Sequence, residues 1–292
     1  MNDASRSRRI AAYLYRRPRL QLRLLLAAPL AWLLLAYIGS LALMFANAFF
    51  RLDSFTGRVV FEPTLDNFAT VIGTEVYRTI TIRTVLLAAV VTLTCVVLAF
   101  PIAYYMARVA SPRMRGWLIV ATLMPLWVSY LVKVYAWRTM LIGNGAIDWA
   151  LSPIGLGTPG FGEVALWLVF TYLWLPYMIL PIYAGLERIP NSLISASEDL
   201  GARPLTTFRR VILPLVFPAV VAGSIFTFSL TLGDYIIPQI IGSSRLFIGQ
   251  AVYAQQGTAG NIPLAAAFTV VPIVIMGLYL WMARRMGAFD AL

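Results

Sequence analysis

The sequence predicts an all-α polytopic membrane protein with six transmembrane helices, and three observations lead to this fold class. Of its 292 residues, 60% are apolar and only 12% are charged, whereas soluble domains carry about 25% charged residues. Six apolar runs are long enough to cross a hydrocarbon core, which takes about 20 residues of helix. Basic residues are dense in alternate loops only, as a fixed orientation in a membrane requires.

Each apolar run has the length of one spanning helix. The runs cover residues 22–48, 80–107, 117–141, 164–186, 212–235 and 263–284. We expect helices because backbone groups in lipid must find their hydrogen-bond partners within the segment. The first run is too long for the apolar core of a cleaved signal sequence, which has about 7–15 residues. Residues 1–21 are therefore expected to form a basic segment before a single membrane domain, 22–292.

The arginines predict that both termini are cytoplasmic. On this assignment the inner side carries sixteen basic residues: Arg6, Arg8, Arg9, Arg16, Arg17, Arg19, Arg23, Arg108, Arg113, Arg115, Arg188, Arg203, Arg209, Arg210, Arg284 and Arg285. The outer side carries five, namely Arg51, Arg58, Arg78, Arg83 and Arg245. Positively charged loops stay on the cytoplasmic side, so the skew favours six spans in an inner (cytoplasmic) membrane. The net charge of +11 then indicates lipid contact rather than a nucleic-acid partner.

Composition excludes several other functions. The chain has no histidine and a single cysteine, Cys95, inside an apolar run. We therefore expect no metal site, no disulfide and no catalytic residues. No segment reads G-x-x-x-x-G-K-[ST], so the chain should bind no ATP through a P-loop. Acidic residues are absent from the centres of the apolar runs, which disfavours an ion-coupled secondary transporter.

A polar elbow, residues 191–211, precedes the fifth span. Asn191 or Ser192 is expected to cap a short helix that carries Glu198 and Asp199. Gly201 should end that helix, because glycine readily adopts left-handed geometry after a C-cap. Pro204 then bars continuation, and a second amphipathic piece leads into the fifth span. A short, charged and rigid projection of this kind is typical of a docking element for a soluble partner.

The elbow resembles the signature of binding-protein-dependent ABC importer permeases, E-A-A-x-x-x-G-x9-I-x-L-P. Gly201 occupies the glycine position, Val211 the isoleucine position, and Leu213 and Pro214 close the motif. Ala196 matches the second position, whereas Ser195 and Ser197 stand where the signature has glutamate and alanine. In the signature, the opening glutamate offers a carboxylate to the ATPase. The departure at Ser195 leaves open whether such a contact exists in this chain, with Glu198 or Asp199 as its alternative source.

Two further stretches resemble the first-permease type of spermidine/putrescine importers. One is Pro125–Trp137 in the third span, and the other is Gly233–Gly242 after the fifth. The resemblance covers roughly residues 65–285. It implies the ABC importer permease (type I, MetI-like) fold and import of a small organic solute, with a polyamine as the first candidate. Another small solute, amino-acid-like, opine-like or a different organic cation, stays open.

The resemblance also implies partners and roles. A dimer of ATPase subunits would bind ATP and magnesium, a second homologous permease would complete the pathway, and a periplasmic protein would deliver solute. Coupling to the ATPase would fall to Ser195, Ala196, Ser197, Glu198, Asp199, Gly201, Arg203, Leu213 and Pro214. The alternative role for Arg203, Arg209 and Arg210 is to anchor the elbow at anionic lipid rather than to contact the ATPase.

Aromatic and charged residues near the third to fifth spans are candidates for the solute pathway. They are Trp127, Tyr130, Lys133, Tyr135, Trp174, Tyr177, Asp234 and Tyr235. Ring faces attract alkylammonium groups through cation–π interaction, although the same rings also suit an interfacial belt or helix packing. Lys133 is expected to pair with Asp234, because an unpaired charge inside a bundle is costly.

Overall fold

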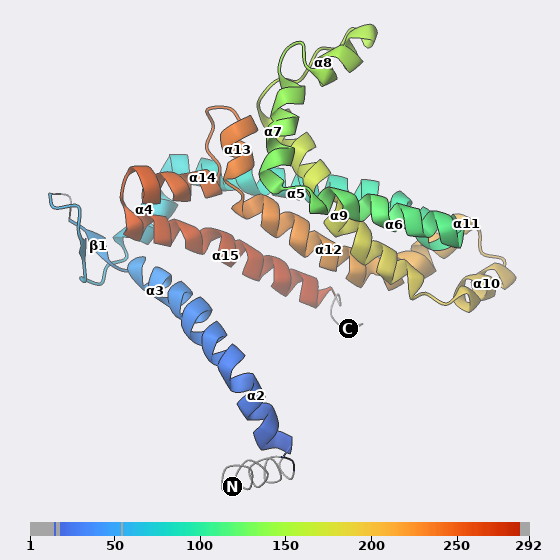
Figure 1. Ribbon diagram of the computed structural model, residues 1–292, viewed down its shortest axis with the longest axis horizontal. Helices are drawn as coiled ribbons and strands as arrows, with labels where there is room; N and C mark the ends of the chain where they lie inside the picture. The colour runs from blue at the N-terminus through green and yellow to red at the C-terminus, as the bar shows by residue number, and fades with distance from the viewer. Residues whose placement is uncertain (1–14, 16–17, 54, 287–292) are drawn as a thin grey trace, which may run out of the picture.

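The computed structural model describes residue 15, residues 18–53 and residues 55–286. Its long helices form one bundle, with an N-terminal helix that diverges at one side and a helical projection at the other (Figure 1). Within the described residues, five helices are long and apolar enough to cross a membrane, and a bent pair makes a sixth span. The all-α, six-span prediction is thereby confirmed. Most of the expected segment 1–21 lies outside the described residues.

The spans follow the predicted order. The first joins α2 (Pro18–Trp32) to α3 (Gly39–Asn47) through a π-helical stretch, Leu33–Ile38. The others are α5 (Glu75–Tyr104), the pair α6 (Pro112–Trp127) and α7 (Tyr130–Leu141), α9 (Glu163–Glu187), α12 (Leu213–Gly233) and α15 (Ile262–Arg285). Short elements fill the loops: β1 (Arg51–Leu52) and β2 (Val59–Val60) pair antiparallel, followed by α4 (Asp66–Gly73), α8 (Ala146–Leu151), α10 (Asn191–Asp199), α11 (Pro204–Thr207), α13 (Ile236–Ile241) and α14 (Ile248–Tyr253).

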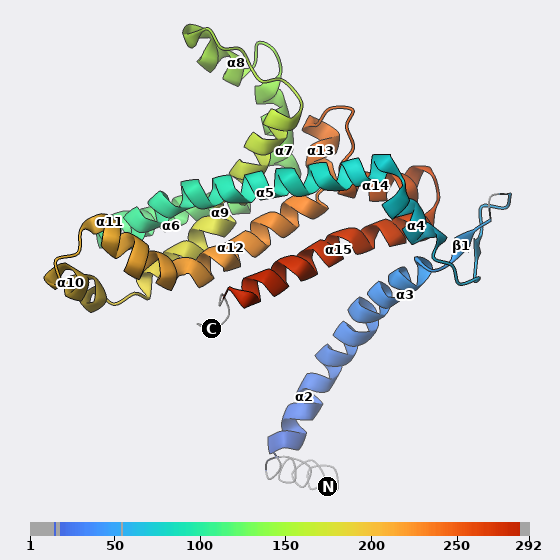
Figure 2. The ribbon, with the colours of Figure 1, turned by 180° about the vertical axis from the view of Figure 1, so that it is seen from behind.

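The centre of the bundle is built by α5, α9 and α12, which pack against one another along most of their length (Figure 2). Two glycines bring α9 and α12 close together. A Cβ on Gly185 would lie 2.5 Å from that of Ala219, and one on Gly223 would lie 2.7 Å from the sulfur of Met178. Small residues allow such close approach in membrane helices.

The third span is bent rather than straight, which corrects the prediction of one helix over 117–141. The axes of α6 and α7 differ by 92°, and Val128 and Ser129 between them are extended. The Pro125 carbonyl, which a continuous helix would pair with the amide of Ser129, instead accepts a hydrogen bond from Lys133 Nζ at 3.0 Å. The lysine thus satisfies a carbonyl at the end of α6, and α7 leaves the bundle sideways (Figure 1).

Ion pairs join α9 to α5 at one end of the bundle and to α6 at the other. The 25 residues of α9 extend about 37 Å, enough to cross a hydrocarbon core of about 30 Å. Its first residue, Glu163, lies 3.6 Å from Arg83, and its last, Glu187, lies 3.2 Å from Arg115. These two carboxylates mark the levels at which the helix enters and leaves the apolar layer.

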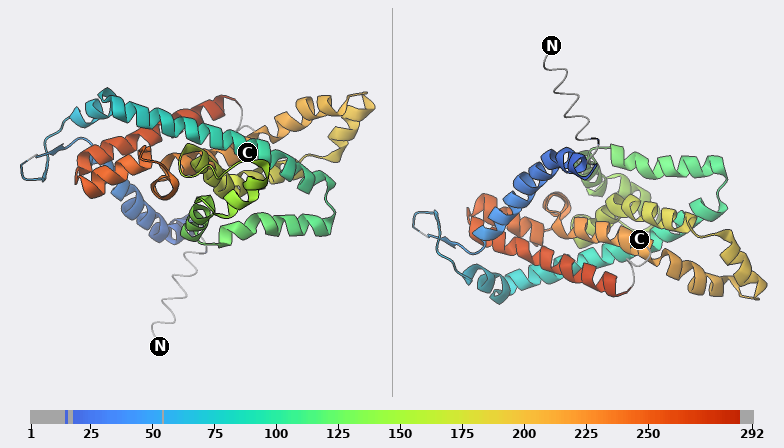
Figure 3. Two further views of the ribbon diagram at one scale, coloured as in Figure 1. Left: turned by 90° about the horizontal axis from the view of Figure 1, so that it is seen from above. Right: turned by 90° about the horizontal axis from the view of Figure 1, so that it is seen from below.

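The N-terminal span separates from the rest of the bundle. It meets α15 near one end and then diverges, as the views from above and below show (Figure 3). None of the residues in its apolar stretch is buried. An apolar helix with so little of its surface covered is suited to lipid or to another membrane subunit.

Candidate functional site

The elbow folds as the sequence predicts. Helix α10 ends at Asp199, and Gly201 has a left-handed backbone with φ of 76°. The amide of Gly201 donates to the Glu198 carbonyl at 2.8 Å, and the amide of Ala202 donates to the Ser197 carbonyl at 3.1 Å. These two bonds form a Schellman motif, which satisfies the last carbonyls of α10. The chain therefore turns sharply without leaving unpaired backbone groups.

The second half of the elbow is fixed to the first and to the bundle. Pro204 opens α11, where its missing amide is no loss. Ser197 Oγ lies 2.9 Å from Thr207 Oγ1, which joins α10 to α11. Phe208 packs edge-on against Phe100 of α5, with ring centroids 5.3 Å apart. The serine that departs from the family signature thus makes a contact that alanine could not.

The outward surface of the elbow combines apolar and charged side chains. Leu200 is 88% exposed and Leu205 is 60% exposed. Exposed polar and charged residues surround them: Ser195, Glu198, Asp199, Arg203, Arg209 and Arg210. Ala196 is also exposed, whereas Leu213 and Pro214 lie in the first turn of α12. A leucine pair in a charged rim is typical of a protein-docking surface.

The predicted cap of α10 is wrong in its detail. Pro190 occupies the N-cap position, and neither Asn191 nor Ser192 caps through its side chain. Asn191 Oδ1 instead accepts a hydrogen bond of 2.6 Å from Arg108 Nη1. Because proline already fixes the backbone angle that starts a helix, the asparagine is free for this longer-range contact.

Arg108 was not singled out from the sequence beyond its count as a basic loop residue. Its Nη2 donates to the carbonyls of Leu186 at 2.6 Å and Ile189 at 2.8 Å. One guanidinium thus joins the end of the α5 span to both the end of α9 and the start of the elbow. Helix C-termini present free carbonyls to cations, so an arginine at the end of a neighbouring span is the sequence signal for this contact.

Arg115 forms a second connection beside it. Its Nη1 donates to Glu187 at 3.2 Å, and its Nε donates to the Met106 carbonyl at 3.1 Å. Tyr183 Oη donates to the same Glu187 carboxylate at 3.1 Å. Together with Arg108, this contact ties the loop at 108–116 to α9, so displacement of the elbow would be passed to α5 and α6 as well as α12.

The candidate pathway residues meet where α7 and α13 leave the bundle. Tyr130 Oη donates a hydrogen bond to the Asp234 carboxylate, whose other oxygen accepts from the Ile237 amide at 2.9 Å. Asp234 follows the last residue of α12 and caps the short helix α13. The carboxylate is half-buried, so it is held in place by two donors while remaining accessible.

Aromatic rings continue from this pair into the bundle. Tyr130 stacks on Trp174 with centroids 6.3 Å apart, and Trp174 meets Tyr177 at 5.9 Å. Tyr177 in turn stacks on Phe226 of α12 at 6.4 Å. Phe226 was not among the predicted residues, because nothing in its apolar surroundings distinguishes it in sequence. The structure therefore assembles Tyr130, Trp174, Tyr177 and Asp234 into one cluster.

Other predicted residues lie apart from this cluster. The expected pairing of Lys133 with Asp234 is wrong, because Lys133 contacts the Pro125 carbonyl and Asp234 is engaged by Tyr130. Trp127 and Tyr135 are 79% and 52% exposed, as residues that face lipid or another subunit would be. Tyr235 stacks on Tyr253, the last residue of α14, with centroids 5.0 Å apart.

Comparison with known proteins agrees with this architecture. Residues 95–288 match the family model "Binding-protein-dependent transport system inner membrane component". The chain is 46% identical over 302 residues to the inner membrane ABC transporter permease protein YdcU of Escherichia coli (strain K12), across 97% of this chain and 95% of that protein. It is 28% identical over 264 residues to the spermidine/putrescine transport system permease protein PotB of the same strain, across 87% and 94% of the two chains.

Solved structures of low sequence identity share the fold. A chain of the bacterial alginate ABC transporter, in complex with alginate pentasaccharide-bound periplasmic protein, superposes with a TM-score of 0.72 at 18% identity. That match covers 93% of this chain and 96% of the other. A chain of the MetNI methionine ABC transporter in an inward-facing conformation gives 0.53 at 18% identity, over 75% and 99% of the two chains.

The elbow, the bent third span and the packing of α5, α9 and α12 therefore occur in a chain whose relatives are transport permeases. Both the length of the match and the identity to YdcU exceed what chance resemblance among apolar helices produces. The chain belongs to the binding-protein-dependent transport system inner membrane components, and it is a multi-pass inner-membrane permease subunit of an ABC importer.

Proposed function

We propose that this permease imports a small organic cation of the polyamine class, spermidine- or putrescine-like. The observation that carries the proposal is the half-buried Asp234 carboxylate beside the rings of Tyr130 and Trp174. A carboxylate has about four acceptor sites, and two of those on Asp234 are taken by Tyr130 and Ile237. The remaining sites suit an ammonium group.

The aromatic cluster complements the rest of such a solute. Polyamines alternate charged amines with methylene segments, and ring faces attract both methylenes and cations. The rings of Trp174, Tyr177 and Phe226 follow one another at about the spacing of neighbouring helix turns. An extended diamine would bind Asp234 with one amine and pass its chain along these rings.

Relatives support the same class. PotB is named as a spermidine/putrescine permease, whereas the name of YdcU specifies no solute. The alternative is a different small solute, amino-acid-like or opine-like, moved by the same mechanism. An ion-coupled secondary transporter is disfavoured by family membership, and the likeness to alginate and methionine transporters concerns the fold alone.

The elbow is proposed to couple transport to ATP hydrolysis by a separate subunit. Its exposed Leu200 and Leu205 would dock on an ATPase, and closure of an ATPase dimer around ATP and magnesium would move it. The contacts of Phe208 and Arg108 would pass this movement to α5 and α9. This chain itself would bind neither nucleotide nor metal and would catalyse no reaction.

The remaining partners and the orientation belong to the same proposal. Both termini and the elbow would face the cytoplasm, as the arginine distribution requires. A second homologous permease would complete the pathway, a heterodimer being expected. A periplasmic solute-binding protein would deliver the cation at the end of the bundle opposite the elbow.

Uptake of radiolabelled putrescine into cells carrying the complete transporter tests the solute class. Replacement Asp234→Asn keeps the shape of the side chain but removes its charge, so uptake should fall by at least roughly tenfold, the loss expected when a charge-assisted hydrogen bond is removed. Glu75→Gln is the matched control, because Glu75 is an exposed acidic residue at the start of α5. Unchanged putrescine uptake by the Asp234 variant would contradict the proposal, as would uptake of neutral or acidic solutes alone.

A further inference from the structure

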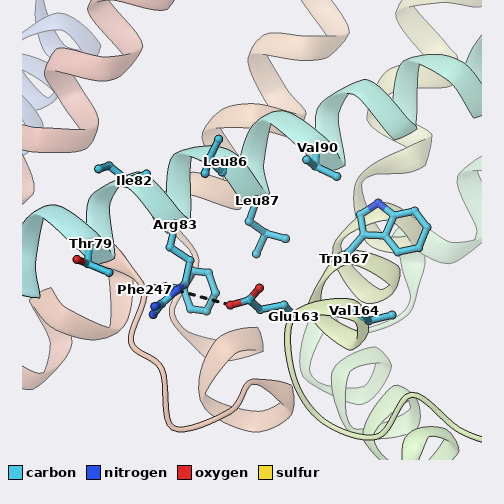
Figure 4. Close-up of a pocket in the computed structure, with 10 residues that line it drawn as sticks. All are labelled: Thr79, Ile82, Arg83, Leu86, Leu87, Val90, Glu163, Val164, Trp167 and Phe247. Atoms are coloured by element: carbon cyan, nitrogen blue, oxygen red, sulfur yellow. Dashed lines mark ion pairs between the residues drawn. The ribbon is translucent and has the colours of Figure 1, made fainter.

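A groove lies between α5 and α9 at the end of the bundle opposite the elbow. It has a volume of about 540 Å³ and is separate from the aromatic cluster around Asp234. Its floor and sides are apolar, with Ile82, Leu86 and Val90 from α5 and Val164 and Trp167 from α9 (Figure 4). Neither the coupling elbow nor the proposed pathway uses this groove.

The three α5 residues form an exposed apolar stripe. Ile82, Leu86 and Val90 are spaced by four residues and therefore lie on one face of the helix. Their exposed fractions are 60%, 60% and 51%. In a membrane-spanning helix such a stripe is suited to hydrocarbon. The apolar lining residues from Ile82 to Val90 extend about 12 Å along α5, which suits an acyl chain.

Arg83 and Glu163 line the mouth of the groove, and Arg245, which is not a lining residue, pairs with Glu163 beside it. Glu163 Oε1 lies 3.6 Å from Arg83 Nε and 3.0 Å from Arg245 Nη1. Two guanidinium groups thus share a single carboxylate oxygen, which leaves one positive charge unbalanced. Arg245 is 62% exposed in its side chain, so donors of this guanidinium remain available to a ligand.

The depth of this charge in the membrane follows from the position of Glu163 on α9. Glu163 is the first residue of that helix, and Glu187 at its other end lies about 37 Å away along the axis. The mouth of the groove is therefore at the headgroup level, while Val90, seven residues along α5 from Arg83, lies about 10 Å deeper in the apolar layer.

We propose that this groove binds one anionic phospholipid, with its phosphate between Arg83 and Arg245 and an acyl chain along Leu86, Val90 and Trp167. A phosphodiester carries one negative charge and so neutralises the charge that Glu163 leaves uncompensated. Arginine is suited to this role because its planar fork donates to two phosphate oxygens at once. The site depends neither on the solute nor on the coupling function proposed above.

Native mass spectrometry of the complete transporter tests the site. The complex, released from micelles that contain dioleoylphosphatidylglycerol or dioleoylphosphatidylcholine, should retain the anionic lipid preferentially. Arg245→Gln should reduce that retention at least roughly tenfold, as expected for loss of hydrogen bonds to a charged group. Arg78→Gln is the matched control, since Arg78 is exposed on the same end of α5 but, unlike Arg83 and Arg245, forms no ion pair with Glu163 in the described residues.

Replacement of the carboxylate distinguishes a lipid site from a purely structural ion pair. Glu163→Gln removes the negative charge that competes with phosphate, so it should tighten retention of phosphatidylglycerol, in the direction opposite to Arg245→Gln. A purely structural role would make both variants lose stability together and leave lipid retention unselective. Equal retention of the two lipids, or equal effects of the Arg245 and Arg78 replacements, would overturn the proposal.

Photocrosslinking identifies what covers the groove in the assembled transporter. Benzoylphenylalanine introduced in place of Val90 should crosslink to phospholipid in native membranes. Crosslinking to a second permease subunit instead would overturn the proposal, because the groove would then be part of a subunit interface.

Discussion

Gly201 is the residue on which the shape of the elbow depends. Its φ of 76° lies in the left-handed region, and a Cβ at this position would meet no atom within 4 Å. Space is therefore no obstacle to a side chain, and backbone strain alone selects glycine. Asparagine tolerates this conformation far better than a β-branched residue does.

Two replacements of Gly201 should consequently differ. Gly201→Val would add strain of about 1–3 kcal/mol and disrupt the Schellman turn, so ATP-driven uptake should fall by roughly tenfold or more. Gly201→Asn should retain most of the uptake. Transport measured in cells with equal amounts of permease in the membrane checks this. Equal activity of the two variants would show that the turn does not transmit movement.

At the scale of elements, the predicted inner loop at 108–116 forms the end of the α5 span and the start of α6, and its arginines hold α9 and α10. Arg108 makes three hydrogen bonds of 2.6 to 2.8 Å to the segment 186–191. Positive charge in this loop was predicted to set orientation. The structure adds that the Arg108 guanidinium connects the elbow to the α5 and α9 spans.

Removing the hydrogen bonds of Arg108 should uncouple ATP hydrolysis from transport. Arg108→Ala should lower uptake by roughly tenfold, since hydrogen bonds to a charged group contribute about 1.5–3 kcal/mol, while hydrolysis by the complex continues. Arg108→Lys should be intermediate, because an ammonium cannot reproduce the fork. ATP hydrolysed per solute imported, measured in proteoliposomes, is the discriminating quantity.

Arg113→Ala is the control for that experiment, because Arg113 is exposed in the first turn of α6. It should leave the ratio of hydrolysis to import unchanged. A parallel decline of hydrolysis and uptake in the Arg108→Ala transporter would indicate a general loss of structure. It would contradict the proposal that Arg108 passes movement from the elbow to the spans.

At the scale of the whole molecule, the helices were predictable because lipid imposes length and hydropathy on each span. The run at 164–186 corresponds to Glu163–Glu187, and the run at 263–284 to Ile262–Arg285. The position of Gly201 in the elbow was predictable for a similar reason, since a left-handed turn requires a specific residue type.

The 92° bend of the third span was not predictable from hydropathy. Both halves are apolar, and the break is accompanied by a hydrogen bond from Lys133 to the Pro125 carbonyl. That contact arises from the bend itself, which no periodicity reveals. The same reason explains why the Lys133–Asp234 pair was expected, since sequence indicates which charges need partners but not which partners lie within reach.

Of the candidate site, the residue types were predictable and their grouping was not. Aromatic residues were indicated throughout the third to fifth spans, and tertiary packing selected Tyr130, Trp174 and Tyr177 as neighbours of Asp234 while leaving Trp127 exposed. The boundary between a basic segment 1–21 and a membrane domain 22–292 stays a prediction.

If the elbow couples this permease to ATP hydrolysis, a reagent must reach it from the cytoplasmic side of the membrane, and thiol labelling measures this. In a Cys95→Ser background, Leu200→Cys places a single thiol at the most exposed apolar position of the elbow. A membrane-impermeant maleimide should label it in inside-out vesicles only, and the ATPase subunit should protect it. Labelling from the periplasmic side, or labelling that the ATPase leaves unchanged, would contradict the central claim that the elbow couples this permease to ATP hydrolysis.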